Sequence, residues 1–187
     1  NAWVMETSTR NRFVVVSTGD LDGRIFRLSL DGRYLLFTRA ADQANQVNSL
    51  WAANLKTNPI KLIDLGIENV VHYAEFDANS RRVAYSTADW SEAAPGWQAN
   101  NDLYEIELRE DGTIGDPIRI QAANSGSVYG WWGNQYAWSP DQTQFLVAQA
   151  DQVGLIDESS GVSSELISIP PYQTGGDWAW VPGIAWS

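Results

Sequence analysis

The sequence predicts an all-β protein, a β-propeller built from four-stranded antiparallel blades. Three observations lead to this prediction: a repeated pair of apolar residues, a tight polar turn after each complete repeat of the pair, and the lack of any ten-residue stretch with convincing helical periodicity. Four antiparallel strands that recur in units of ~40–60 residues point to propeller blades.

The apolar pairs set the register of the repeat. The two members of each pair are spaced by two residues, as in a half-buried strand, and the pairs recur after 48, 62 and 48 residues. We therefore expect the second member of each pair to occupy an equivalent, mostly buried position on an innermost strand. The pairs are Phe26 and Leu28, Ala74 and Phe76, Tyr136 and Trp138, and Ile184 and Trp186.

Three complete blades and two partial blades account for the chain. In each complete blade the apolar pair is followed by three more strand-like segments, which are separated by polar turns. Because closed propellers have about four blades or more, we expect a single incomplete propeller domain, cut from a larger protein. The expected ranges are 1–19 for the end of a preceding blade, 25–65, 72–122 and 134–169 for complete blades, and 183–187 for the start of a following blade.

The turn sequences resemble the TolB-like, or WD-like, propeller repeat. Trp138-Ser139-Pro140-Asp141 matches the W-S-P-D-G pattern best, Leu28 to Gly32 matches in part, and Phe76 to Ser80 matches weakly. The resemblance implies a bacterial, extracytoplasmic protein, either periplasmic or at the cell surface. Its repeat also builds the gating propellers of prolyl-oligopeptidase-like enzymes, so it indicates the fold more sharply than the function.

Composition excludes several classes of function. A net charge of −11 repels phosphate and makes nucleic-acid binding a poor expectation. No apolar run approaches the ~18 residues that cross a membrane, so we expect no membrane insertion. The chain has no cysteine, which rules out disulfides and thiolate chemistry.

The connections between strands predict one short-loop face and one long-loop face. The turns between strands one and two, and between strands three and four, are short, whereas the other connections include long segments such as 88–101. The long segments are rich in aromatic residues, which anchor interfaces well. We expect a binding surface on this face, although the same side chains could instead cover blade edges. Its candidate residues are Trp90, Trp97, Tyr129, Trp131, Trp132, Tyr172, Trp178 and Trp180.

Catalytic signals are scarce in the sequence. His72 is the only histidine, no G-x-S-x-G elbow is present, and Asp20 to Gly23 lacks the later ligands of a calcium loop. We expect Glu105 and Glu107 to lie on an exposed strand face, although paired carboxylates for sugar hydrolysis stay open. The sequence therefore predicts no catalytic residue, metal site or cofactor in this chain.

Two functions are consistent with these observations. The first is a non-catalytic module that presents its long-loop aromatic face to a protein or glycan partner. The alternative is the accessory, substrate-gating propeller of a prolyl-oligopeptidase-like serine peptidase whose catalytic domain lies outside this chain. In either case, sheet edges left open at the ends of a broken ring could support self-association.

Overall fold

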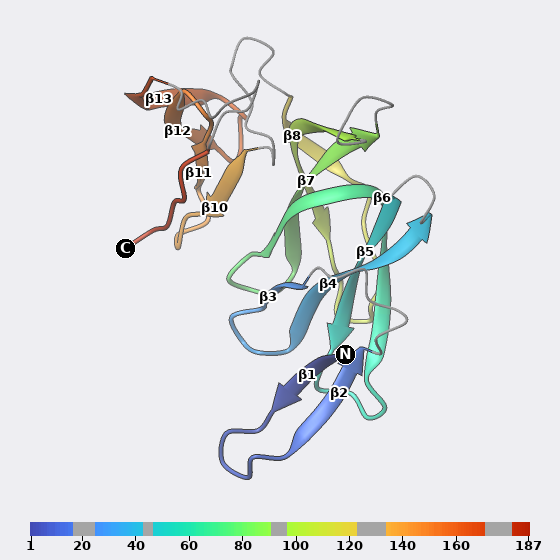
Figure 1. Ribbon diagram of the computed structural model, residues 1–187. Coiled ribbons are helices and arrows are strands. Elements are labelled where there is room, and N and C mark those ends of the chain that lie inside the picture. Colours follow the sequence, from blue (N-terminus) through green and yellow to red (C-terminus); the bar gives the residue numbers. More distant parts are fainter. Residues whose placement is uncertain (17–24, 43–46, 91–96, 123–133, 171–180) are drawn as a thin grey trace.

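The computed structural model describes residues 1–16, 25–42, 47–90, 97–122, 134–170 and 181–187. These residues form thirteen β-strands and no helix, arranged in sheets of two, seven and four strands (Figure 1). None of them belongs to a helix that could span a membrane. The prediction of an all-β protein is confirmed.

The seven-stranded sheet consists of two blades that share one long strand. The first half of β6 pairs with β5 up to Asn69, and the second half pairs with β7 from Val70 onward. Blade A is β3, β4, β5 and the first half of β6; blade B is the second half of β6, β7, β8 and β9; blade C is β10 to β13. The strands are β1 (Ala2–Met5), β2 (Arg12–Val16), β3 (Ile25–Leu28), β4 (Tyr34–Asp42), β5 (Val47–Asn54), β6 (Lys61–Phe76), β7 (Arg82–Trp90), β8 (Trp97–Glu107), β9 (Ile118–Gln121), β10 (Gln135–Trp138), β11 (Gln144–Ala148), β12 (Gln152–Asp157) and β13 (Ser163–Ser168).

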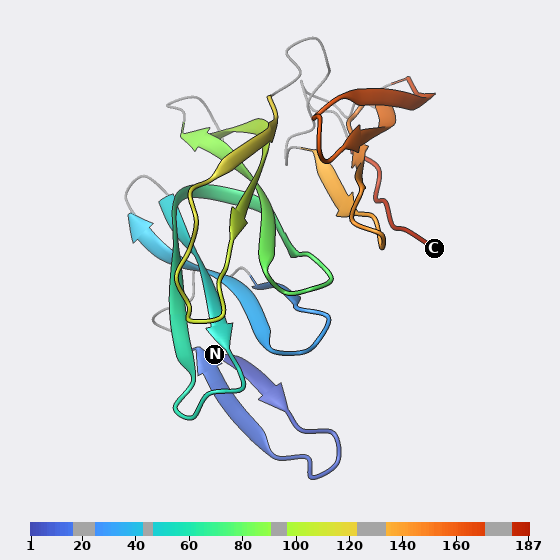
Figure 2. The ribbon, with the colours of Figure 1, turned by 180° about the vertical axis from the view of Figure 1, so that it is seen from behind.

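The blades pack face to face in chain order, with the β1–β2 unit against blade A (Figure 1, Figure 2). The first four residues of strand β4 are all apolar because both of their faces are covered. Leu35 and Phe37 face the β1–β2 unit, while Tyr34 and Leu36 face blade B. A strand covered on both faces needs apolar side chains at odd and even positions alike. The run Tyr34 to Phe37 therefore marks a strand in the middle of a stack.

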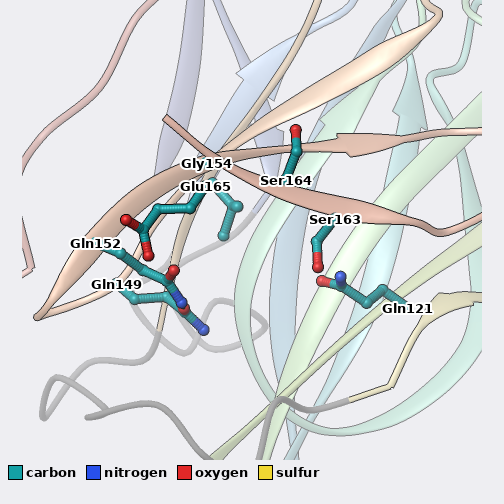
Figure 3. A pocket seen from close by; sticks show the side chains of 8 residues that line it. Gln121, Gln149, Gln152, Gly154, Ser163, Ser164 and Glu165 are labelled. Carbon is teal, nitrogen blue, oxygen red and sulfur yellow. The ribbon is translucent and has the colours of Figure 1, made fainter. Parts of the chain in front are cut away.

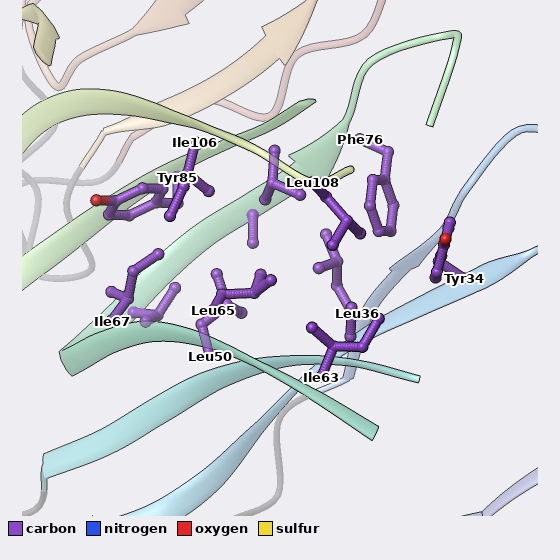
Figure 4. Close-up of a cluster of buried hydrophobic side chains, with 14 residues drawn as sticks. Tyr34, Leu36, Leu50, Ile63, Leu65, Ile67, Phe76, Tyr85, Ile106 and Leu108 are labelled. Carbon is purple, nitrogen blue, oxygen red and sulfur yellow. The ribbon is translucent and has the colours of Figure 1, made fainter. Parts of the chain in front are cut away.

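The largest apolar cluster lies between blades A and B. Leu50 and Leu65 of blade A and Ile106 of blade B are completely or almost completely buried in it. Figure 4 shows the two sets of side chains facing one another, with Leu65 on one side and Ile106 on the other. A second cluster, with Trp138 and Phe145 stacked 4.7 Å apart, joins blades B and C. Burial between blades thus holds the array together.

The turn between the first two strands has the same geometry in all three blades. The residue after the apolar pair is Ser29, Asp77 or Ser139, and its side chain accepts a hydrogen bond from the backbone N–H five residues later. Three residues into each turn the backbone φ is positive, at 64° for Gly32, 58° for Ser80 and 64° for Gln142. This repetition supports the 48- and 62-residue intervals of the register.

The register predicts burial correctly at two of its four positions. Phe76 and Trp138 are both 7% exposed at the ends of inner strands. The prediction is wrong for Leu28, which is 54% exposed and belongs to no buried cluster, whereas Phe76 packs with blade A and Trp138 with blade B. It is also wrong for Trp186: residues 181–187 form no strand, and its indole Nε1 donates to the Ala137 carbonyl at 2.8 Å.

The strands reach further into the predicted long-loop face than the sequence suggests. Strand β7 continues to Trp90 and β8 begins at Trp97, with the two tryptophans as Cα partners in the ladder. The ladder extends because a register shift between Ser86 and Ala88 lets pairing resume beyond the blade. Residues 88–90 and 97–101 of the expected connection thus belong to the strands β7 and β8. Asp20 to Gly23 lies outside the described residues, and the division of the chain into domain ranges stays a prediction.

We predict that Ser139→Ala lowers the free energy of unfolding by about 1 kcal/mol, the usual value of one buried hydrogen bond. Ser139 is 7% exposed; its Oγ accepts from the Gln144 N–H at 3.0 Å and donates to Asp141 Oδ1 at 2.6 Å. Urea unfolding of the variant measures the loss. Ser8→Ala, at an exposed position of the β1–β2 turn, is the control and leaves stability unchanged; equal values for the two variants would contradict the role of the turn.

Candidate functional site

Arg82 connects blade B to blade C. Its Nη1 donates to Glu105 Oε2 at 3.1 Å in its own blade and to Glu158 Oε1 at 2.5 Å in blade C. Its Nη2 lies 3.4 Å from Gln142 Oε1, and its guanidinium lies 5.0 Å from the centre of the Trp138 ring. A planar guanidinium with five donors can make all of these contacts at once, whereas a lysine ammonium could not.

Acidic groups outnumber basic ones around Arg82. Asp77 Oδ2 lies 3.5 Å from Arg82 Nε, so three carboxylates share one guanidinium. Burial raises the pKa of Glu105; Arg82 opposes this rise, while the charges of Glu158 and Asp77 add to it. Ionisation of Glu105 in this cluster is therefore less favourable than ionisation of a free glutamate side chain.

The sequence-based assignment of Glu105 to an exposed strand face is wrong. Only 14% of its side chain is exposed, because blade C covers this part of β8. Glu107 lies on the same face nearer the end of the strand, is 53% exposed and pairs with Arg109 at 2.9 Å. Both residues point to the same face of β8, so they differ in exposure only because blade C covers Glu105 and does not reach Glu107.

Glu75 joins the inner strands of all three blades. Its Oε1 accepts from Arg27 Nη1 on β3 at 2.7 Å, and its Oε2 accepts from the backbone N–H of Trp138 on β10 at 3.2 Å. The Tyr73 hydroxyl also donates to Oε2 at 2.8 Å. Burial raises the pKa of Tyr73 well above its usual value, and the Glu75 charge adds to this, so the phenol stays protonated as a donor.

A pocket of about 220 Å³ lies where these inner strands meet, on the short-loop side of the blades. We call it the axial pocket. Its walls combine apolar side chains, including the exposed Leu28 and Leu30, with the Arg27–Glu75 ion pair. Mixed walls of this kind suit a ligand that has both an apolar and a polar part. The lining residues are Arg27, Leu28, Leu30, Glu75, Phe76, Asp77, Ala78, Trp138, Ser139, Pro140 and Gln142.

The predicted aromatic surface is described only in part. Trp90 and Trp97 lie opposite each other at the ends of β7 and β8, although the directions of their side chains lie outside the description. The other six candidates lie outside the described residues. They are Tyr129, Trp131, Trp132, Tyr172, Trp178 and Trp180.

The residues that link the blades were missed by the sequence analysis. Glu75 carries a usable signal, because a carboxylate stands between the apolar residues Ala74 and Phe76 at the end of an inner strand. Arg82 carries none, since the adjacent Arg81 is equally basic but pairs with the exposed Glu110. Among the described residues, no group of three or more His, Cys, Asp and Glu side chains has the geometry to hold a metal ion.

Solved structures show what the fold is similar to. No protein-family model and no curated protein matches the chain. The propeller domain of the trilobed protease from Pyrococcus furiosus aligns at a TM-score of 0.55 with 11% identity, over 90% of this chain and 48% of that one. The acylaminoacyl peptidase from Pyrococcus horikoshii aligns at 0.52 with 12% identity, over 89% and 28%. A gluconolactonase from Xanthomonas campestris aligns at 0.56 with 14% identity, over 88% and 54%.

The fold is a β-propeller. Identities of 11–14% establish no more than this, because one fold carries many unrelated functions. The chain spans between about a quarter and about half of the length of these three proteins. The function of this propeller is therefore argued from its own residues.

We predict that Glu105→Gln is at least as stable as the wild type at pH 7. The raised pKa means that the folded chain favours a neutral side chain at this position. Glu105 contributes stability below its unfolded pKa of about 4.3 and loses it as the pH rises through the folded pKa. The wild type should therefore lose stability relative to the variant between about pH 4 and pH 7, which urea unfolding at a series of pH values measures.

Arg82→Gln is the comparison for this prediction. It leaves three carboxylates without their cation and should cost about 2 kcal/mol at pH 7, less than a fully buried pair because 28% of the Arg82 side chain is exposed. If Glu105→Gln were as destabilising as Arg82→Gln, the assignment of the raised pKa would be wrong.

Proposed function

We propose that this chain is part of the accessory, non-catalytic propeller of a serine peptidase, and that the axial pocket contacts peptides on their way to a catalytic domain outside the chain. The observation that carries the proposal is the meeting of three inner strands around an open, amphipathic pocket. Similarity to two peptidases that contain such propellers supports it, as does the resemblance seen in the turn sequences.

The chemistry of the axial pocket fits a peptide better than a charged or fully apolar ligand. Leu28 and Leu30 are 54% and 82% exposed and offer an apolar surface to a side chain. Next to them, 59% of the Arg27 side chain is exposed, so guanidinium N–H groups that do not bind Glu75 can donate to a peptide carbonyl. A peptide supplies both kinds of group at adjacent atoms.

The full-length gene product tests this proposal. We expect a fluorophosphonate probe to label a serine outside residues 1–187, and we expect Leu30→Trp, which narrows the axial pocket, to lower kcat/KM for long peptides severalfold. A dipeptide-sized substrate should be affected much less, because it has less surface to pass through a narrowed opening. The absence of any labelled serine would contradict the proposal.

A second candidate function is a binding module that uses the long-loop face. Here the favourable observation is the ladder pairing of Trp90 with Trp97 beyond the body of blade B. Directly opposed residues on one face of a hairpin lie close enough to form a joint aromatic surface. Such a surface is suited to a protein or a glycan, because aromatic side chains provide a large contact area.

For this candidate, we predict that Trp90→Ala combined with Trp97→Ala weakens binding of any ligand found on a glycan panel at least tenfold. Trp3→Ala is the matched control, since Trp3 is 56% exposed on β1 in a different unit of the fold. Binding that survives the double substitution, or is lost equally in the control, would exclude the hairpin as the binding surface.

A further inference from the structure

A small polar pocket lies between the outer parts of blades B and C, away from the axial pocket. It has a volume of about 60 Å³, room for about two water molecules. Figure 3 shows Gln121 and Ser163 on one side of it and Gln149, Gln152 and Glu165 on the other. The lining residues are Gln121 of blade B and Val147, Gln149, Gln152, Gly154, Ser163, Ser164 and Glu165 of blade C.

Gly154, which lines the pocket, lies where the backbones of β12 and β13 approach each other closely. Gly154 is the Cα partner of Glu165, next to a register shift between Val153 and Gly154. A Cβ at this position would lie 2.6 Å from the Ser164 carbonyl oxygen, which no side chain can tolerate. The close approach of β12 to β13 therefore requires glycine here, because the Ser164 carbonyl oxygen occupies the space that a side chain would need.

The lining is rich in hydrogen-bonding groups and has one formal charge. Gln121, Gln149 and Gln152 supply carboxamides, Ser163 supplies a hydroxyl and Glu165 supplies a carboxylate, while the Ser164 hydroxyl points away from them (Figure 3). Gln152 donates to Gln149, which is only 5% exposed and so is fixed in the wall. None of the described residues that line the pocket is Lys, Arg or His.

Glu165 supplies the formal charge of this pocket from β13, a strand on which every residue is exposed. Within the described part of the chain, Glu165 takes part in no ion pair, unlike Glu75, Glu105, Glu107, Glu110 and Glu158. The Glu165 carboxylate and the neighbouring amide and hydroxyl oxygens can all accept hydrogen bonds, and no cationic side chain of the described lining residues lies among them. Hydrogen bonds between a carboxylate and a cationic donor are about twice as strong as those between neutral groups.

We infer that the pocket binds a primary ammonium group, either a free alkylamine or a lysine side chain of a peptide. Three donor hydrogens of an ammonium match the Glu165 carboxylate and the neighbouring amide and hydroxyl oxygens. An anion is excluded by the carboxylate and by the net charge of −11. A sugar ring is too large for about 60 Å³, so a neutral polyol could insert only one hydroxyl. The site is separate from the axial pocket and does not depend on the proposed peptidase role.

Titration of the chain with n-butylammonium chloride, followed by NMR of the side-chain amides of Gln121, Gln149 and Gln152, tests the inference. We expect shifts at these amides and a dissociation constant on the order of 1 mM, as for a ligand of few atoms. Nα-acetyl-lysine amide, titrated in parallel, distinguishes a lysine side chain from a free amine, and binding of either supports the site. n-Butanol and glucose serve as neutral probes and should bind at least tenfold more weakly.

Two substitutions locate the binding. Glu165→Gln keeps the shape of the side chain, removes its charge and should weaken n-butylammonium at least tenfold. Gln121→Leu, on the facing blade, should weaken it severalfold. Glu110→Gln makes the same change of charge at an exposed ion pair elsewhere and should have no effect. The inference is overturned if n-butanol or glucose binds as tightly as n-butylammonium, if the amides do not shift, or if Glu110→Gln weakens binding as much as Glu165→Gln.

Discussion

The Arg82 guanidinium is the interaction on which the arrangement of blades B and C depends. Apolar contacts between blades are non-directional and tolerate sliding, whereas a planar group with donors to Glu105 and Glu158 fixes one relative position. Its contact with the Trp138 ring ties the same group to the inner strand of blade C. Arg82 therefore fixes the position of blade B relative to blade C, which the apolar contacts alone would leave free to slide.

The same interface combines three physical environments over a short distance. A charged cluster lies at the short-loop end, and an apolar cluster that includes Phe145 and Ile156 fills the middle. The small polar pocket lined by Gln149 lies toward the outer strands. The apolar middle lowers the local polarity and so strengthens the electrostatic interactions beside it. This explains why Glu105 has a raised pKa although it contacts a cation: burial outweighs the single positive charge that three carboxylates share.

The sequence was sufficient for the fold because its signals are local. Alternation and turn chemistry repeat in each blade, and the Ser139 turn is visible as a short motif. Burial was predictable only where a neighbouring blade is present, which is why Phe76 was predicted correctly and the edge residue Leu28 was not. Glu75, Arg82 and Gly154 act through partners 48 to 76 residues away or through the close approach of two backbones, and no local pattern encodes such distances.

Strand β6 belongs to two blades, and this has an evolutionary consequence. No connecting segment lies between blades A and B, because the backbone passes from one ladder to the next between Asn69 and Val70. An insertion at that point would split a continuous strand and separate both ladders, so this junction offers no place for new sequence. Between β9 and β10 the chain has a separate stretch at 122–134. Inserted residues can therefore be accommodated between blades B and C, at 122–134, but not between blades A and B, at Asn69 and Val70.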